Sequence, residues 1–237
     1  MALTSAIDRL AASPGLHYKG RFDSPAGAAD VDMRISHSGV ALGSMSDSGT
    51  AFRILALPDR TFVRAGEAFW RSTTSAQTTS DPKPRAELVK RYSRSWVAVD
   101  ARSIGDPGVT LRPAEVARQF SEQLRQTGVT RVDRGAVGEQ QSTIITVGPT
   151  TYHVTADSPY RLLRVESPRI KAARAAMRGA VRGAALRTEQ RLAPSDDGLD
   201  FGEMDPSELD GFYDTVETRR NANSARRSTH GWRSTPR

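Results

Sequence analysis

The segments LHYKGRF (16–22) and VDMRIS (31–36) decide the fold, because apolar and polar side chains alternate along both of them. Leu16, Tyr18 and Phe22 would share one face of a strand, while the residues between them would take the opposite face. In the second segment, Val31, Met33 and Ile35 would lie on one face in the same way. This period of two predicts strands with one apolar and one polar face.

The same pattern continues along the chain. The segments VALGSM (40–45), AFRILAL (51–57) and TFVRA (61–65) alternate with turn residues, and Phe69-Trp70 closes this run. Further strands are expected at residues 95–99, 129–134, 142–147, 150–156 and 160–165. Short strands at hairpin spacing predict an antiparallel meander and argue against parallel βαβ units.

Helical spacing of apolar residues occurs in a few segments between these strands. We expect a short helix over residues 3–12, two turns over 86–92 and a long helix over 111–126 that ends at Gly128. Residues 71–85 are almost entirely polar and are expected to form a surface loop. The predicted fold class is therefore α+β, with an antiparallel sheet as its main element.

The charge distribution divides the 237 residues into a body and a tail. The expected sheet domain spans residues 1–168, whose 21 basic and 17 acidic residues are ordinary for a solvated surface. Residues 169–191 carry seven basic residues and one acidic residue, residues 192–217 carry nine acidic and no basic residues, and residues 218–237 carry six basic and no acidic residues. A net charge of +7 therefore averages strongly opposed blocks, and it is weak evidence for nucleic-acid binding.

The tail is expected to contain a basic helix and an acidic helical segment within residues 169–217, followed by a disordered basic stretch at 218–237. Arg174, Arg178 and Arg182 would stack at i+4 spacing on the basic helix, where like charges repel one another. These three residues are our candidates for contact with an anionic partner, which the acidic segment of the same chain would also provide. The segment Asp205–Glu208 is expected to begin the acidic helix, with Leu209, Phe212, Tyr213 and Val216 as its anchors.

Known signatures of catalysis, metal binding and cofactor binding are missing from the sequence. The chain has no cysteine, and its four histidines are isolated. The nucleotide-binding motifs G-x-G-x-x-G and G-x-x-x-x-G-K-S/T are absent, and so is the G-x-S-x-G motif. No window approaches the length of apolar residues that a transmembrane helix needs. We therefore expect no catalytic residues, no metal site, no cofactor and no enzymatic activity.

Aromatic residues fall on or beside the predicted strands and the long helix, and they suggest two alternatives. They could simply fill a hydrophobic core, as aromatic residues on strands commonly do. Alternatively, they could line a cavity that opens on one face of the sheet.

The order of these elements resembles the LppX/LprG-type envelope lipoproteins of mycobacteria and related actinobacterial sheet proteins. The resemblance covers roughly residues 3–166 and rests on short motifs: LHYKGRF (16–22), GVALG (39–43), FRILALPDRTFVRA (52–65), Phe69-Trp70, WVAV (96–99), Leu111-Arg112-Pro113 and PYRLLR (159–164). It implies a LolA-like fold, in which a strongly curved antiparallel sheet forms a half-barrel and helices pack on its concave face. In characterised relatives the apolar hollow holds lipid acyl chains. Carried over onto this sequence, the implied ligand-binding residues are Phe22, Ile35, Leu42, Phe52, Ile54, Phe62, Phe69, Trp70, Trp96, Phe120 and Leu124.

The chain also departs from that family. We expect no signal peptide in this sequence, unless its first residues replace a removed leader or transmembrane segment, and it has no lipobox cysteine. The compact lipoproteins have no counterpart to the charged tail. The resemblance implies a location in the cell envelope or outside the cell, and the missing leader leaves the cytoplasm as the alternative.

Three functions remain as hypotheses from the sequence. The first is the non-enzymatic binding or carriage of a lipid or another apolar small molecule. The second is an interaction or scaffold protein with a self-filled core, whose basic tail helix docks a protein partner or an anionic membrane surface. Nucleic-acid binding is a distant third, because the acidic block would compete for the arginines.

Overall fold

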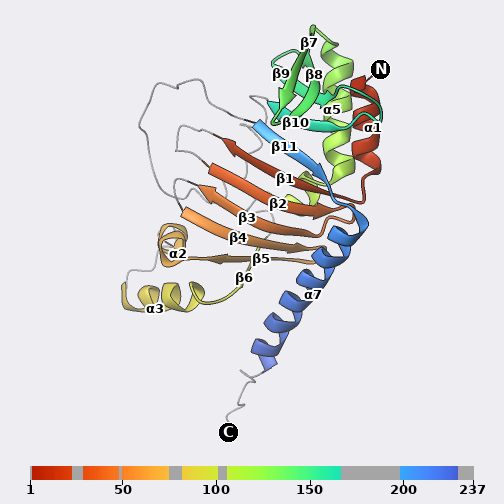
Figure 1. Cartoon of the computed structure of the whole chain (residues 1–237). Coiled ribbons are helices and arrows are strands. Elements are labelled where there is room, and N and C mark those ends of the chain that lie inside the picture. Colours follow the sequence, from red (N-terminus) through yellow and green to blue (C-terminus); the bar gives the residue numbers. More distant parts are fainter. Residues whose placement is uncertain are drawn as a thin grey trace, which may run out of the picture.

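The computed structural model describes residues 2–22, 29–47, 50–74, 82–100, 106–166 and 198–228. Figure 1 shows their arrangement as one large sheet with helices beside it. The helices are α1 (Ala2–Ala12), α2 (Glu67–Thr74), α3 (Pro82–Tyr92), α4 (Pro107–Thr110), α5 (Pro113–Thr127) and α7 (Pro206–Ser228). The strands are β1 (Gly15–Phe22), β2 (Ala29–Ser36), β3 (Ala41–Asp47), β4 (Thr50–Leu57), β5 (Arg60–Ala65), β6 (Val97–Val99), β7 (Arg131–Val137), β8 (Gln140–Val147), β9 (Thr150–Thr155), β10 (Leu162–Glu166) and β11 (Gly198–Glu203).

The eleven strands form one antiparallel sheet in the order β6-β5-β4-β3-β2-β1-β11-β10-β9-β8-β7. Strands β1 to β6 are neighbours in sequence and in space, and so are β7 to β10. The sheet is not closed into a barrel, since β6 and β7 lie at opposite edges. The expectation of an α+β fold built on an antiparallel meander is thus confirmed.

Strand β11 joins the two halves of the sheet and corrects the prediction for the acidic segment. It pairs with β1 on one side and with β10 on the other, although the sequence pattern placed residues 198–203 in the tail. Leu199 and Phe201 are buried and alternate with Asp200, which lies opposite both Lys19 and Arg164. The acidic residue therefore finds basic neighbours in adjacent strands, which favours this pairing.

The two faces of the sheet differ in polarity because the alternation predicted from sequence is realised in the register. Leu16, Tyr18, Met33 and Ile35 belong to the main hydrophobic cluster and are almost completely buried. The alternate positions carry residues such as Lys19 and Asp32, which lie opposite each other on the other face. One face is therefore apolar, and the other carries most of the charge.

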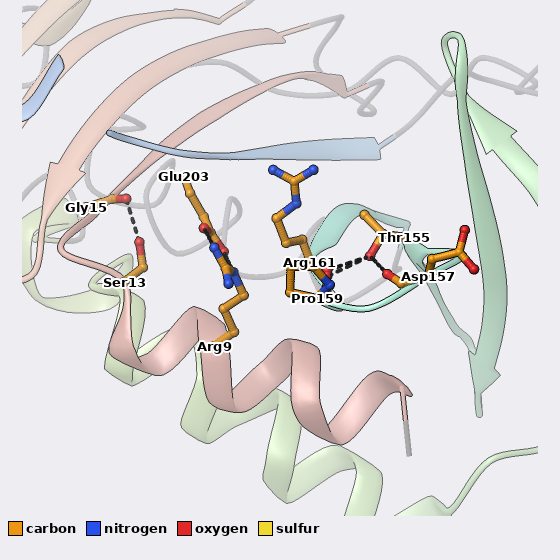
Figure 2. A network of polar contacts seen from close by, with 8 residues as sticks. All are labelled: Arg9, Ser13, Gly15, Thr155, Asp157, Pro159, Arg161 and Glu203. Carbon is orange, nitrogen blue, oxygen red and sulfur yellow. Dashed lines mark hydrogen bonds and ion pairs between the residues drawn. The ribbon is translucent and has the colours of Figure 1, made fainter. Parts of the chain in front are cut away.

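Helices α1 and α5 pack against each other and cover the apolar face over β8, β9 and β10. The guanidinium of Arg9 on α1 donates two hydrogen bonds of 2.7 Å to the carboxylate of Glu203 at the end of β11 (Figure 2). The hydroxyl of Ser13 donates to the carbonyl of Gly15 where α1 leads into β1 (Figure 2). These contacts attach the first helix to the central strands.

Helices α2 and α3 pack together at the other end of the sheet, and α2 contacts β4. The run of hairpin-linked strands ends at β5, as expected, and Phe69 and Trp70 follow it in helix α2. Parts of the predicted loop at 71–85 are also helical, since α2 extends to Thr74 and α3 begins at Pro82. This segment is almost entirely polar, so its sequence has no apolar periodicity that would have indicated a helix.

Helix α7 packs on the opposite face of the sheet. Its first turn is capped as expected: the Asp205 carboxylate accepts hydrogen bonds from the Ser207 hydroxyl and the Glu208 amide, and the Glu208 carboxylate accepts one from the Asp205 amide. The anchors Phe212 and Val216 are buried against Leu55 and Phe62, whereas Tyr213 keeps 39% of its surface exposed.

The structure describes residues 198–228 of the predicted tail but not its first part. Helix α7 continues to Ser228, so residues 218–228 are helical and the prediction of disorder there is wrong. An ion pair of 3.7 Å between Arg220 and Glu217 supports these turns. The predicted basic helix, with Arg174, Arg178 and Arg182, lies outside the described residues.

Candidate functional site

The candidate site is the apolar face of the sheet with the helices that pack on it. Most of the residues implied by the family resemblance lie in or against its main cluster: Ile35, Phe52, Ile54, Phe69 and Trp70 are buried members, and Phe120 and Leu124 are partly buried beside them. Strands β2 and β4 and helices α2 and α5 thus contribute to one continuous apolar surface.

Leu42, Phe62 and Trp96 do not belong to this surface, which corrects their assignment. They lie in a second cluster with Leu55, on the face that α7 covers. Their strand neighbours explain the result: Phe62 is followed by Val63, a member of the main cluster, and adjacent residues of a strand point to opposite faces. The side chain of Phe22 in β1 lies outside the described residues.

Aromatic rings form a connected row where α2 and α3 meet the sheet. The ring centroids of Phe52 and Phe69 are 5.0 Å apart, those of Phe69 and Trp70 are 5.0 Å apart, and those of Trp70 and Tyr92 are 5.2 Å apart. The last two contacts are edge-on, which is a favoured geometry for aromatic pairs. This row gives one end of the site a rigid apolar boundary.

A second aromatic group lies under α5 near the middle of the sheet. Phe120 contacts Tyr152 and Phe201 edge-on at 5.2 Å and 6.1 Å, and Phe201 contacts Tyr18 at 5.3 Å. Sequence reasoning missed Phe201 because its acidic neighbours placed it in the tail. The alternation of Leu199, Asp200 and Phe201 was the available signal for a strand.

Tyr18 and Gln123 on this face form hydrogen bonds with neighbouring elements. The Tyr18 hydroxyl donates a hydrogen bond of 2.7 Å to the Leu111 carbonyl, and burial raises the pKa of this phenol well above its usual value. The Gln123 amide donates to the Thr150 hydroxyl at 2.6 Å, and its carbonyl accepts from the Tyr152 hydroxyl at 3.2 Å. These groups order α5 and the strands, and the phenol stays protonated near neutral pH.

No group of three or more histidine, aspartate or glutamate side chains is arranged to hold a metal ion within the part of the chain that the structure describes. None of the helices in that part has the length and apolar character needed to cross a bilayer.

Open grooves run along both sides of α7 on the other face. One has a volume of about 510 Å³ and is lined by residues of β4, β5 and α7, including Phe62, Arg60 and Tyr213. The second has a volume of about 390 Å³ and lies between α7 and strands β2 to β4, with Arg34, Arg53 and Arg219 in its lining. The first groove is bordered by both apolar and charged side chains, and the second is distinguished by its arginines.

Comparison with protein-family models found no match, and comparisons with curated proteins and with solved structures found none either. The likeness to LppX/LprG-type lipoproteins therefore stays a prediction from the motifs in the sequence.

Proposed function

We propose that the protein binds an acyl lipid or a similar apolar ligand between the sheet and its helices, without catalysing a reaction. The observation that carries this proposal is the composition of the apolar face. From β1 to β5, the side chains described on this face are uncharged, and they include Tyr18, Met33, Ile54 and Val63. Transfer of each methylene group from water to such a surface contributes about 0.8 kcal/mol, so binding needs no reactive group.

The arrangement of the helices supports the same proposal. Measured across the strands, a sheet of eleven strands is roughly 50 Å wide, and two adjacent helices cover about 20 Å of that width. Helices α1 and α5 lie over β8 to β10, whereas α2 and α3 lie toward β4 at the other end. The central side chains Leu16, Tyr18 and Met33 are already buried, so a ligand between these two pairs would lie against residues that are only partly buried beside the main cluster. Met45 on β3 and Phe120 on α5 are both only partly buried against the main cluster, and we place the entrance beside them.

We also propose two features that the family resemblance implies. These are a strong curvature of the sheet, as in the LolA-like half-barrel, and a location in the cell envelope. The two-faced sheet and the helix pairs are compatible with that arrangement.

Extraction of the natively purified protein with organic solvent, followed by mass spectrometry, tests the proposal. We expect acyl lipids in a stoichiometric amount, and we expect a delipidated sample to take up a fluorescent fatty-acid probe. A sample without bound lipid that also fails to take up the probe would support the self-filled core instead.

Substitutions at Met45 locate the ligand. Met45→Trp would fill space beside the main cluster, and Met45→Lys would place a charge there, so each should weaken probe binding by about tenfold. Ala51→Lys is the matched control, because Ala51 is exposed on the neighbouring strand β4. Circular dichroism and thermal unfolding establish that each variant is folded. Unchanged binding in folded Met45 variants, or an equal loss with Ala51→Lys, would contradict this location.

A further inference from the structure

A row of polar residues crosses the charged face of the sheet, and its charges are balanced at only one end. Arg164, Asp200, Lys19 and Asp32 follow one another on neighbouring strands, each directly opposite the next, so that basic and acidic residues alternate. Ser44 on β3 is opposite Asp32. The row then ends in two basic residues, since Ser44 is opposite Arg53 on β4 and Arg53 is opposite Arg64 on β5.

Two arginines directly opposite each other destabilise a sheet unless an anion compensates them. In the part of the chain that the structure describes, neither Arg53 nor Arg64 forms an ion pair with a carboxylate. The arrangement therefore has an electrostatic cost that the described residues do not offset.

Helix α7 brings a third arginine to the same place. The guanidinium of Arg219 lies 5.8 Å from the centroid of the Trp96 ring, and this cation–π contact positions it. Burial is the main cause that lowers the pKa of Arg219 from its ordinary value, and the charges of Arg53 and Arg64 lower it further. Three guanidinium groups from β4, β5 and α7 thus converge near one another.

Arg53 and Arg219 also line the groove of about 390 Å³ beside α7, together with Arg34. The groove includes two carboxylates, but each has another partner. A carboxylate oxygen of Asp32 lies 2.7 Å from Nε2 of His17. The Glu208 carboxylate accepts a hydrogen bond from the Asp205 amide at the start of α7. The groove has room for a ligand, and guanidinium groups offer paired donors that match the oxygens of a phosphate.

We propose that Arg53, Arg64 and Arg219, with Arg34 beside them, form a binding site for a phosphate group on the face of the sheet that carries α7. The site is separate from the proposed apolar site, which lies on the other face. The phosphate can be supplied as a free ion or as the head group of an anionic lipid, and the two sources are distinguished experimentally.

Calorimetric titration of the full-length protein with inorganic phosphate tests for the free ion. Co-sedimentation with phosphatidylcholine vesicles that contain a minority of phosphatidic acid tests for the lipid head group, with pure phosphatidylcholine vesicles as the reference. Both are carried out at constant ionic strength in chloride, so that general screening does not change between samples.

The variants Arg53→Gln, Arg64→Gln and Arg219→Gln should each weaken binding by about tenfold, because a charge-assisted hydrogen bond is lost. Arg60→Gln removes the same charge from the same strand as Arg64, at a residue that pairs with Asp59 at 3.0 Å, and should leave binding unchanged. Phosphate should also raise the melting temperature of the wild type more than that of the variants, which serves as a second readout.

Binding of phosphate in solution with the expected variant pattern would identify a free ion as the ligand. The same pattern with vesicles alone would identify a lipid head group. Absence of binding in both assays would overturn the proposal, and so would losses with Arg60→Gln as large as those with Arg219→Gln, since they would indicate attraction by net charge only.

Discussion

At the scale of single residues, His153 on β9 stands out as a buried titratable group. Its Nε2 lies 3.6 Å from a carboxylate oxygen of Glu166, beyond hydrogen-bond distance, and it has only a small exposed surface. Burial is the main cause that lowers its pKa from the ordinary value of 6.5, although the charges of Glu166 and Asp200 act in the opposite direction and Arg164 adds to the lowering. The neutral imidazole is therefore the form that the folded protein favours.

This lowered pKa predicts how stability depends on pH. Since the unfolded chain binds the proton more readily, the stabilising effect of neutral His153 is present above about pH 6.5 and is lost as the pH falls through the folded-state pKa. We expect the free energy of unfolding to decrease less between pH 7 and lower pH in His153→Gln than in the wild type, as measured by urea denaturation. The exposed His37 provides the control, His37→Gln, which should follow the wild type. An identical pH profile for His153→Gln and the wild type would contradict this assignment.

At the scale of elements, the attachment of α5 to the sheet depends on one buried amide. The Gln123 side chain donates to Thr150 on β9 and to the Val147 carbonyl of β8, and it accepts from the Tyr152 hydroxyl. Apolar contacts of Val116 and Ala117 complete this interface.

Replacement of Gln123 by Leu should cost about 1–3 kcal/mol of stability, because the change leaves buried polar partners unsatisfied. Chemical denaturation measures this change as a lower midpoint. The double variant Gln123→Leu with Tyr152→Phe should recover part of the loss, since one unsatisfied hydroxyl is removed. An unchanged midpoint in the single variant would show that the amide has no such role.

Individual elements also show what sequence periodicity can and cannot predict. Strands β1 and β2 were predictable because apolar and polar residues alternate along them. Strands β4 and β5 were predictable from the turn residues around them, since both carry consecutive apolar residues. Helix α7 was predictable at its start, where Asp205 and Glu208 form a capping box. Helix α2 was not, since it has only eight residues and Phe69-Trp70 are adjacent in a pattern that fits either type of element.

At the scale of the whole molecule, β11 could not be placed from local patterns. Its pairing partners, β1 and β10, are distant in sequence, and its acidic neighbours resemble a solvated segment. The register that brings Asp200 between Lys19 and Arg164 depends on strands that form elsewhere. Contacts of this kind are tertiary, and the composition of the segment itself does not indicate them.

The candidate site was predictable on one face of the sheet and not on the other. Residues on the apolar face followed from alternation, as Ile35 and Ile54 show. The error at Leu42, Phe62 and Trp96 arose because apolar residues on the second face were assumed to face the same interior. A sheet covered by helices on both faces needs apolar residues on both, and α7 is the helix that the sequence pattern did not place on the sheet.

We propose that an acyl ligand binds on the apolar face, between the sheet and the helix pairs. Photo-crosslinking with a diazirine fatty acid, followed by peptide mapping with mass spectrometry, tests it most directly. We expect labels on peptides that contain Met45, Phe52, Phe69 or Phe120, whose side chains belong to or pack against the main cluster. Labels confined to peptides of α7, or no labelling above that of a denatured sample, would contradict binding on the apolar face.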